Sequence, residues 1–320
     1  PNKEGGFSML EYYMTNEENR VMKMDEITKG CWINMVHPTD EEIYLVAKKL
    51  NIPIDYFKDA LDDEERSRIE KEDNSLFIIV DFPYITHDEV GFPIYETIPI
   101  GIILMEEAFI TVSLNETPIL EDFKNNKVRG FFTYKKTRFA LQILFAISSY
   151  YLRYLKQINR KTNEVEREIH QSMKNKELYK SLALEKSLVY FTTSLKANKI
   201  VLERMLRLNL IKMYEEDKEL LEDVIIENQQ AIEMAETYTS ILNGMMEAFA
   251  SVISNNLNIV MKFLTSFTII LALPTMVASF YGMNVGLPFQ DKPYAFILVM
   301  LIALFLSSLT TYIFWKKKFF

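Results

Sequence analysis

The residues with the most distinctive chemical potential in this 320-residue chain lie in an uncharged segment near its C-terminal end. Amide, hydroxyl and small side chains recur there at steps of three and four residues, the spacing of one helix face. These positions are Asn258, Met261, Thr265, Thr268, Ala272, Thr275 and Ser279. The positions between them are nearly all bulky and apolar. Such a stripe indicates either a pore lining or close helix packing through small residues, and its hydroxyl groups favour the pore.

Two uncharged stretches contain this stripe and follow it. Residues 263–290 and 293–315 carry no charged side chain. About 20 apolar residues in a helix cross the hydrocarbon core of a bilayer. We therefore expect a first span at about 263–280, an external loop at 281–292 and a second span at about 293–315. Two buried core helices are the alternative interpretation.

Basic residues predict the orientation of these spans. Lys262 precedes the first span and Lys316–Lys318 follow the second, whereas the loop has one Lys beside one Asp. Because cytoplasmic flanks carry the excess of Lys and Arg, we expect both termini in the cytoplasm and the chain in the plasma (inner) membrane. The first residues show no apolar region of a signal peptide, which agrees with this orientation.

The rest of the chain is acidic and begins with a mixed region. Residues 1–262 hold the acidic excess of a chain with 36 Lys+Arg and 44 Asp+Glu. Thr39 or Asp40 can cap a helix that ends near residue 51, and the segment 61–74 is expected to be charged surface. A cytoplasmic α/β domain is predicted over 1–135. Its strand-like runs are 7–14, 31–36, 75–85, 95–105 and 108–115.

Helical periodicity then continues to the membrane segment. We expect helices at about 137–175, 178–210 and 217–280, the first two forming an antiparallel hairpin. The third would be about 95 Å long at 1.5 Å per residue, so it needs the hairpin or copies of itself as partners. The predicted fold class is an α+β membrane protein, with a helical hairpin and stalk over 136–262 and a transmembrane domain over 263–320.

Composition and missing motifs exclude several functions. The net charge of −8 argues against nucleic acid as a partner, and one Cys excludes a disulfide framework or a Cys-based structural zinc site. His37, His87 and His170 are scattered, and we interpret them as structural or surface residues. No Walker, Ser-His-Asp or His-Glu-x-x-His pattern is present. We expect no enzyme activity and no organic cofactor.

A short motif follows the first expected span, Tyr281-Gly282-Met283-Asn284, with Pro274 upstream. With a second span and a basic C-terminus after it, this motif resembles the CorA family of magnesium transport proteins. The resemblance covers the whole chain, because the family also has an N-terminal cytoplasmic α/β domain and a very long pore helix. It implies a homopentamer in the lipid bilayer that carries divalent cations, Mg²⁺ and also Co²⁺ or Ni²⁺, with five first spans lining the pore.

The resemblance makes Tyr281, Gly282, Met283 and Asn284 a selectivity filter. Mg²⁺ gives up water reluctantly, so amide and carbonyl oxygens can accept hydrogen bonds from the hydrated ion. Asn284 supplies an amide oxygen, and Gly282 lets backbone carbonyls face the axis. Met261, with Leu264 beside it, would form an apolar constriction that closes by dewetting. Many family members carry acids after the motif, whereas this loop has only Asp291, which predicts weak recruitment of cations.

Regulatory metal ligands are also implied by the resemblance. In the family, acidic residues between neighbouring cytoplasmic domains bind Mg²⁺ and hold the pore shut. Glu247 matches the partner on the long helix and stands three turns before Asn258, on the same face. Asp81 and Asp88 are the candidates on the α/β domain. Solvation of an acidic surface is the alternative for these carboxylates.

Two other functions stay open at this point. A zinc transporter on the same scaffold would share the tripeptide, and the sequence offers no reliable discriminator. A membrane-anchored acidic receptor or scaffold that moves nothing is the third interpretation. It predicts no polar stripe on the first span, whereas the sequence has one.

Overall fold

The computed structural model of the chain describes residues 9–72, 75–172, 175–208, 211–289, 292–317 and 319, with the side chains of 170–172 and 175 not described. Internal contacts divide the chain into two units, Pro1–Leu242 and Asn243–Phe320. Helix α6, Glu215–Tyr281, contributes residues to both units. The domain boundaries expected at residues 135 and 262 stay a prediction.

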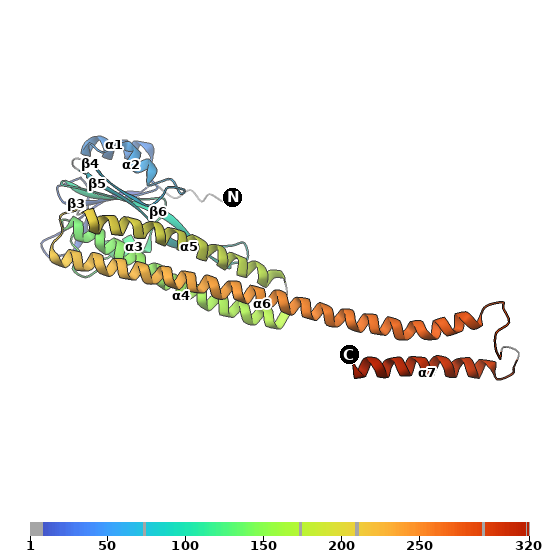
Figure 1. The fold of residues 1–320 in the computed structure, drawn as a ribbon. Helices are drawn as coiled ribbons and strands as arrows, with labels where there is room; N and C mark the ends of the chain where they lie inside the picture. The colour runs from blue at the N-terminus through green and yellow to red at the C-terminus, as the bar shows by residue number, and fades with distance from the viewer. Residues whose placement is uncertain are drawn as a thin grey trace. The chain divides into compact units, whose positions relative to one another are not determined.

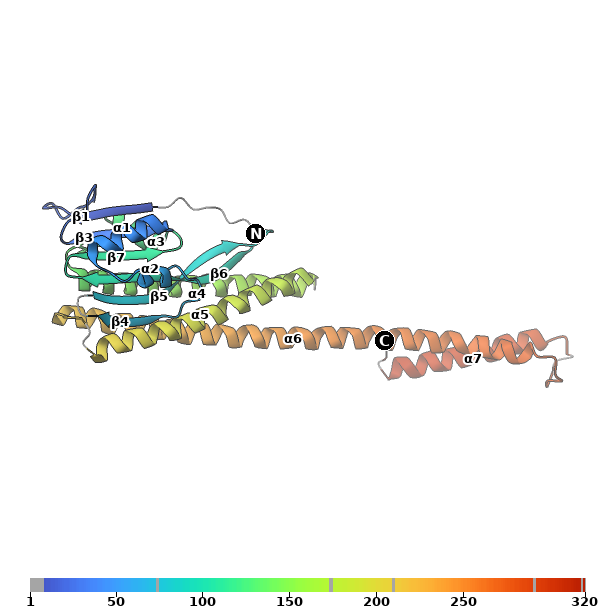
Figure 2. The same ribbon diagram turned by 90° about the horizontal axis from the view of Figure 1, so that it is seen from above.

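A seven-stranded sheet forms the centre of the first unit, with the strand order β2-β1-β3-β7-β6-β5-β4 (Figure 2). The strands are β1 Met9–Thr15, β2 Val21–Met24, β3 Cys31–Val36, β4 Arg68–Glu72, β5 Ser75–His87, β6 Pro93–Met105 and β7 Ala108–Ser113. All neighbours pair antiparallel except β3 and β7, which are parallel. A parallel pair needs a long crossover connection, and here the connection includes α1, α2 and three strands.

Helices cover both faces of this sheet (Figure 1). Helices α1, Asp40–Leu50, and α2, Ile54–Asp59, lie on one face. The other face carries α3, Pro118–Lys124, α4, Lys136–Ser172, and α5, Asn175–Leu208. Every residue of β3 and β7 is buried. The continuous apolar runs of these two strands therefore reflect burial on both faces rather than on one.

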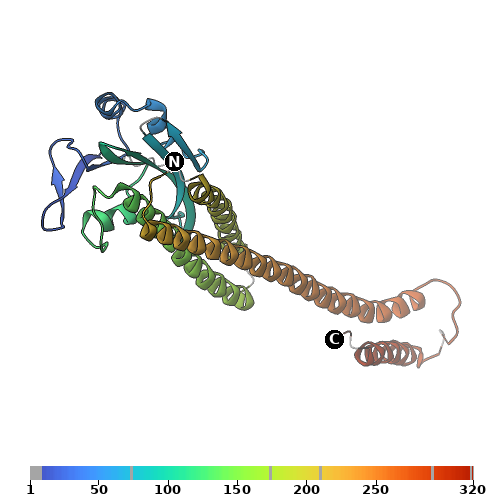
Figure 3. The ribbon, with the colours of Figure 1, turned by 60° about the vertical axis from the view of Figure 1, so that its left-hand side comes forward.

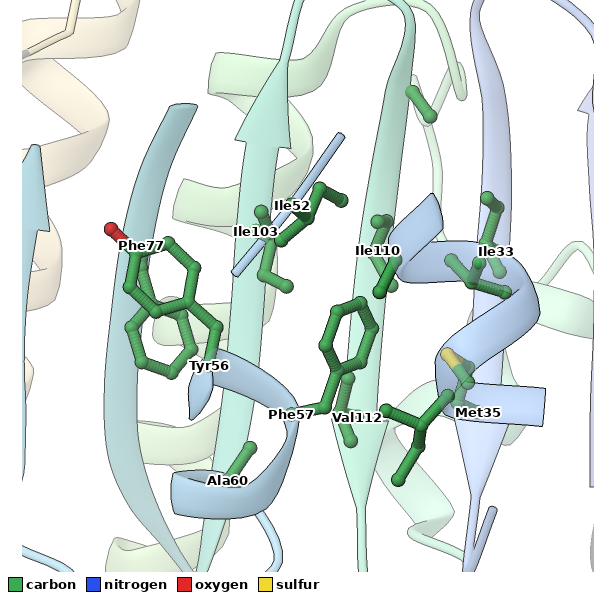
Figure 4. Packing of buried hydrophobic residues seen from close by; sticks show 14 of the residues in the cluster. Ile33, Met35, Ile52, Tyr56, Phe57, Ala60, Phe77, Ile103, Ile110 and Val112 are labelled. Carbon is green, nitrogen blue, oxygen red and sulfur yellow. The ribbon is translucent and has the colours of Figure 1, made fainter. Parts of the chain in front are cut away.

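The core between the sheet and the short helices depends on close contacts of aromatic rings (Figure 4). Tyr56 stacks on Phe77 with ring centroids 4.2 Å apart, and Phe57 is fully buried beside them. Gly101 of β6 has no room for a side chain, because an added Cβ would lie 2.4 Å from the Cβ of Ala60. This glycine lets α2 approach the sheet closely enough to bury these rings.

The N-terminus of α1 confirms the capping expected from the sequence. Thr39 is the N-cap: its hydroxyl accepts from the Glu42 N–H, and the Glu42 carboxylate accepts from the Thr39 N–H in return. Asn51 ends the helix with φ of 54°, the left-handed conformation that Asn adopts readily. Reciprocal capping of this kind stabilises the helix by about 1 kcal/mol.

The described residues of segment 61–74 are largely charged surface, as expected, and they include a strand that was not predicted, β4, Arg68–Glu72. This strand is at the edge of the sheet and pairs antiparallel with β5, Arg68 opposite Ile79. Only Ile69 of β4 is buried. Charged side chains on an edge strand prevent it from pairing with other chains. A run of charged residues can therefore form an edge strand although its sequence is typical of solvated surface.

The long helices lie close to their expected positions, and α6 packs on the hairpin within the first unit. The Asn228 side chain donates to the Leu195 carbonyl of α5 at 3.0 Å, and Arg138 of α4 pairs with the buried Asp217 at 3.3 Å. In the second unit, α7, Ala295–Lys316, runs beside the last turns of α6 in the opposite direction (Figure 3).

Strand β4 begins at Arg68, which pairs with Ile79, so the residues of β5 after Ile79 have no partner in β4. A side chain of α5 occupies this position instead. The buried Asn198 amide donates to the Asp81 carbonyl at 2.8 Å and accepts from the Asp81 N–H at 2.9 Å. It also accepts from the Ser67 hydroxyl at 2.9 Å. Together with the Tyr151 hydroxyl, which donates to the same carbonyl at 3.2 Å, the Asn198 side chain satisfies the Asp81 backbone that β4 leaves unpaired, and it fixes the position of Asp81.

We predict that Asn198→Ala lowers stability by about 1–3 kcal/mol, because it leaves the Asp81 N–H without a partner and leaves the Asp81 carbonyl with the Tyr151 hydroxyl as its one remaining side-chain donor. Hydrogen–deuterium exchange of peptides covering β5 should be faster, and the unfolding temperature should fall. Asn163→Ala, at an exposed position of α4, is the matched control and should change neither value. Equal exchange in both variants would contradict this role of Asn198.

Candidate ion pathway

Helices α6 and α7 are long and apolar enough to cross a membrane. Only 11% of the most apolar window of α6 and 6% of that of α7 are buried. Core helices of a soluble domain would be mostly buried, so this exposure fits helices whose surroundings are a bilayer or other protein chains. The bounds of α6 and α7 include the spans expected at 263–280 and, apart from its first two residues, at 293–315.

The face of α6 that meets α7 is narrow and regular. Ser266 and Val277 are buried there, and Ile270, Leu273 and Pro274 are partly buried. They recur at steps of three and four residues, which defines one stripe of the helix. Pro274 has no N–H to donate to the Ile270 carbonyl, so the α6 backbone is one hydrogen bond short beside α7.

The predicted polar stripe lies on the opposite side of α6. Every one of its residues is exposed, as is Leu264. At 3.6 residues per turn, the stripe is about half a turn from the face that packs on α7. Helix α7 therefore leaves the whole stripe uncovered within the second unit. The stripe consists of Asn258, Met261, Thr265, Thr268, Ala272, Thr275 and Ser279.

Two hydroxyl groups of this stripe have their lone pairs free to accept hydrogen bonds from outside the helix. Thr268 donates its proton to the Leu264 carbonyl at 2.8 Å, and Thr275 donates to the Leu271 carbonyl at 3.1 Å. With the proton engaged by the helix backbone, the lone pairs of each oxygen remain for an external donor. Water bound to a metal cation is such a donor, because the cation polarises its O–H bonds.

The helix ends at the motif that follows the stripe. Tyr281 is the last residue of α6, the Gly282 N–H donates to the Ala278 carbonyl at 3.0 Å, and Met283 and Asn284 are exposed beyond it. A Cβ on Gly282 would lie 3.3 Å from the Ala278 oxygen. A glycine here keeps that side of the final turn narrow and leaves the Ala278 and Ser279 oxygens uncrowded. Asp291, the single acid of the loop, lies outside the described residues.

The two candidate regulatory carboxylates of the first unit, Asp81 and Asp88, lie apart from each other. Asp88 closes the β5–β6 turn, where its Oδ1 accepts from the N–H groups of Val90 and Phe92 at 2.9 and 2.7 Å. Asp81 is seven residues earlier on β5, about 23 Å away at 3.3 Å per residue. Glu247 is an exposed residue of the second unit. Across the described ranges, no group of three or more His, Cys, Asp and Glu side chains could hold a metal ion.

Asp81 has an environment that sequence reasoning did not anticipate. Burial raises the pKa of its carboxyl, and a hydrogen bond with Ser194 offsets part of this rise. It lines a cavity of about 810 Å³ whose lining also includes four other acids, Asp63, Glu64, Glu65 and Glu96, and two cations, Arg66 and Lys196. Glu96 was missed, although its pairing opposite Tyr84 follows from the register of the β5–β6 hairpin. Alternation along that hairpin is the signal that could have found it.

The described histidines do not contribute to these sites. His37 and His87 are both exposed, and His37 has φ of 47° at the turn after β3. The side chain of His170 lies outside the described residues.

Comparison with known proteins gives one family. The model of the family described as "CorA-like Mg2+ transporter protein" matches residues 28–318. A cobalt/magnesium transport protein CorA from Methanocaldococcus jannaschii is 30% identical over 306 residues, 91% of this chain and 93% of that protein. The protein of the same name from Thermotoga maritima is 24% identical over 287 residues, 87% of this chain and 80% of that one.

Solved structures lead to the same family. The complete structure of the CorA magnesium transporter from Methanocaldococcus jannaschii matches with a TM-score of 0.84 and 28% identity. The match covers 96% of this chain and 97% of that one. The predicted combination of a mixed α/β unit, one very long helix and two apolar C-terminal helices is therefore confirmed.

We predict that Asp81→Asn stabilises the chain at pH 7 when divalent cations are removed with EDTA. A raised folded-state pKa means that Asp81 contributes most stability below its ordinary pKa of 3.8 and loses it as pH rises toward the raised value. The variant should therefore lose less stability than wild type between pH 3.8 and pH 7 in thermal unfolding. Asp63→Asn, at an exposed rim position, should follow wild type. An Asp81 variant that also follows wild type would show that burial does not disfavour this charge.

Proposed function

The chain belongs to the family of CorA-like Mg²⁺ transporter proteins, and we propose that it moves hydrated divalent cations, Mg²⁺ first among them, across the plasma membrane. The observation that carries this proposal is the exposed polar stripe of α6, which leads to the Gly-Met-Asn motif. Its threonine oxygens offer lone pairs to hydrated ions, while the other face of the helix packs on α7. The ion gradient and the membrane potential would drive the flux.

The proposed assembly is a homopentamer in which five copies of α6 surround the pathway. A polar stripe cannot face lipid tails at low cost, and α7 does not cover it. Copies of the same helix around an axis satisfy it with water and ions. Following the distribution of basic residues, both termini lie in the cytoplasm and the Gly-Met-Asn motif lies at the outer mouth.

Selection at the mouth would use oxygen atoms rather than charge. Tyr281, Gly282, Met283 and Asn284 from five chains form the filter in this proposal. A ring of amide and carbonyl oxygens accepts hydrogen bonds from the first water shell, so the ion passes without complete dehydration. Met261 and Leu264, both about half exposed on the stripe side of α6, form the apolar constriction.

Intracellular Mg²⁺ would regulate the opening. Glu247 is the proposed ligand on the long helix, and Asp81 or Asp88 is the proposed ligand on the α/β unit of a neighbouring chain. The acidic cavity beside Asp81 supports this arrangement, because a divalent cation relieves repulsion among carboxylates. Two carboxylates 4 Å apart repel by about 4 kcal/mol at an effective dielectric constant of 20.

The alternatives have less support than Mg²⁺ transport. The curated relatives are cobalt/magnesium transport proteins, which favours Mg²⁺ and Co²⁺ over zinc as cargo. A receptor or scaffold that moves nothing gives no reason for the exposed acceptors on α6. Uptake of Mg²⁺, Co²⁺ and Zn²⁺ into liposomes, compared side by side, tests the cargo directly.

We predict that Asn284→Ala and Gly282→Ala each lower Mg²⁺ uptake by at least about tenfold while the oligomer still assembles. The first removes an acceptor from every subunit, worth about 1.5 kcal/mol or more toward a charged hydrate, and the second crowds the Ala278 carbonyl. Gly286→Ala is the matched control, since a Cβ there meets nothing within 4 Å. Near-normal uptake by both filter variants, with the control unchanged, would remove the filter role from the motif.

We predict that Glu247→Gln weakens regulation by internal Mg²⁺. Without this carboxylate Mg²⁺ binds less tightly between neighbouring chains. The difference between its affinities for the closed and open states therefore becomes smaller. Millimolar Mg²⁺ should then protect the cytoplasmic unit from protease less well than in wild type, and uptake should persist at high internal Mg²⁺. Protection equal to that of wild type would make Glu247 an ordinary solvated residue.

A further inference from the structure

A row of basic side chains on α4 has no role in the ion pathway. It consists of Arg153, Lys156, Arg160 and Arg167, which are all exposed and recur at steps of 3, 4 and 7 residues. At 3.6 residues per turn, these four side chains lie within about a sixth of the helix circumference. We call them the basic stripe. Four aligned cations stand out in a chain whose net charge is −8.

Among the described residues the basic stripe forms no ion pair of its own, and the exposed acid beside it on this face, Glu164, pairs with Lys161 at 2.7 Å. None of the four cations forms an ion pair within the described part of the chain. The Arg153 guanidinium lies over the Tyr150 ring at 5.6 Å instead. The stripe is about half a turn from the buried residues Tyr151, Leu155 and Ile158, so it faces away from the sheet.

A groove runs along this stripe and is open to a partner. Arg153, Lys156 and Arg160 line it, and its volume is about 550 Å³. Glu227 of α6 is the one carboxylate among its lining residues. Three cations against one carboxylate leave positive charge in the groove, which a partner with negative side chains would neutralise.

A matching row of acids lies on the N-terminal part of α6. Glu219, Glu222, Asp223 and Glu233 are exposed and, among the residues that the structure describes, form no ion pair. Glu233 accepts a hydrogen bond from the neutral Gln229 side chain at 2.9 Å, which leaves its charge uncompensated. We call these four residues the acidic stripe. It lies opposite the buried face of α6, so it also faces away from the hairpin.

The two stripes have the same length. Arg153 and Arg167 are 14 residues apart, as are Glu219 and Glu233, which is about 21 Å along a helix. Both belong to the first unit, and no ion pair connects them within the described residues of one chain. Four cations and four anions of equal span are therefore available to a second copy.

We propose that the basic stripe on α4 of one chain binds the acidic stripe on α6 of a second copy. Two different surfaces meet in such a contact, so every copy offers one surface to each neighbour, and the repeated contact forms a ring when its rotation closes. The inference rests on the proposed function in one respect, the ring of chains around a pathway. It adds the surfaces that set the order and register of the cytoplasmic units.

Charge complementarity supports a second copy over an anionic polymer or lipid surface. A polymer or lipid would neutralise the basic stripe and leave the acidic stripe uncompensated. A second copy neutralises both at once, because each chain carries both. Exposed pairs of this kind contribute modestly to affinity, while the arrangement of signs disfavours wrong orientations of the partner.

The test reverses each stripe separately and then both together. The basic reversal is Arg153→Glu with Lys156→Glu and Arg160→Glu, and the acidic reversal is Glu219→Lys with Glu222→Lys and Asp223→Lys. Each alone should raise the protomer concentration needed for half assembly by about tenfold, as expected for three modest charge pairs turned repulsive. The combined variant should return to within about threefold of wild type, because the contact is restored with opposite signs. Native mass spectrometry in mild detergent measures the assembly.

A control and a second measurement keep the outcome decisive. Lys48→Glu with Lys49→Glu and Lys58→Glu makes the same charge change on exposed positions of α1 and α2 and should leave assembly unchanged. If a reversed variant does not fold, Arg160→Cys with Glu222→Cys is cross-linked by a short bifunctional reagent, the native Cys31 being fully buried. A ladder of cross-linked chains that requires both cysteines supports the contact.

Three results would overturn the inference: single reversals that assemble like wild type, a combined variant that is not rescued although it folds, or no ladder from the cysteine pair. Anionic vesicles retained by wild type and lost by the basic reversal, with assembly unchanged, would assign the stripe to lipid instead. Ion uptake by wild type is measured separately. Failure of uptake with rescued assembly contradicts the proposed function alone, and normal uptake without any effect on assembly contradicts this inference alone.

Discussion

Polar groups within a bilayer have to face water, ions or other polar groups, and this constraint governs how α6 can be used. Its stripe of hydroxyl, amide and small side chains is fully exposed, while α7 packs on the other side. Lipid tails cannot satisfy such a surface. The length of α6, the narrow contact with α7 and the motif at its end are all consistent with a helix that shares its polar face with copies of itself.

Much of the architecture could be predicted because its signals are local and strong. Thr39 and Glu42 form the capping box that their spacing indicates, and the three long helices lie within a few residues of their expected bounds. Apolar runs located the central strands, since burial on both faces leaves little choice of residue type. The residues of the polar stripe, which are three and four positions apart in the sequence, lie on one uncovered face of α6 in the structure.

Other features depend on tertiary pairing, which no local pattern contains. Strand β4 was not predicted because its charged residues are compatible with both an edge strand and a solvated loop. Only the pairing with β5 distinguishes the two. The surroundings of Asp81 were missed for the same reason. Asn198 is more than a hundred positions away in the sequence, yet it holds the Asp81 backbone, and Glu96 enters the same cavity from the next strand. Asp63, Glu64 and Glu65, which precede β4 in the chain, add three further acids to that cavity.

The orientation of the threonine protons has a consequence for ions of the opposite sign. An anion in a narrow passage needs donors, such as hydroxyl or amide protons directed at it. Thr268 and Thr275 direct theirs into the helix backbone. A passage built from this face would therefore present oxygen lone pairs to chloride at two levels, about two helical turns apart. It could discriminate by the sign of the charge without a fixed carboxylate. It would also lack the deep electrostatic well in which a carboxylate can hold a divalent ion for long times.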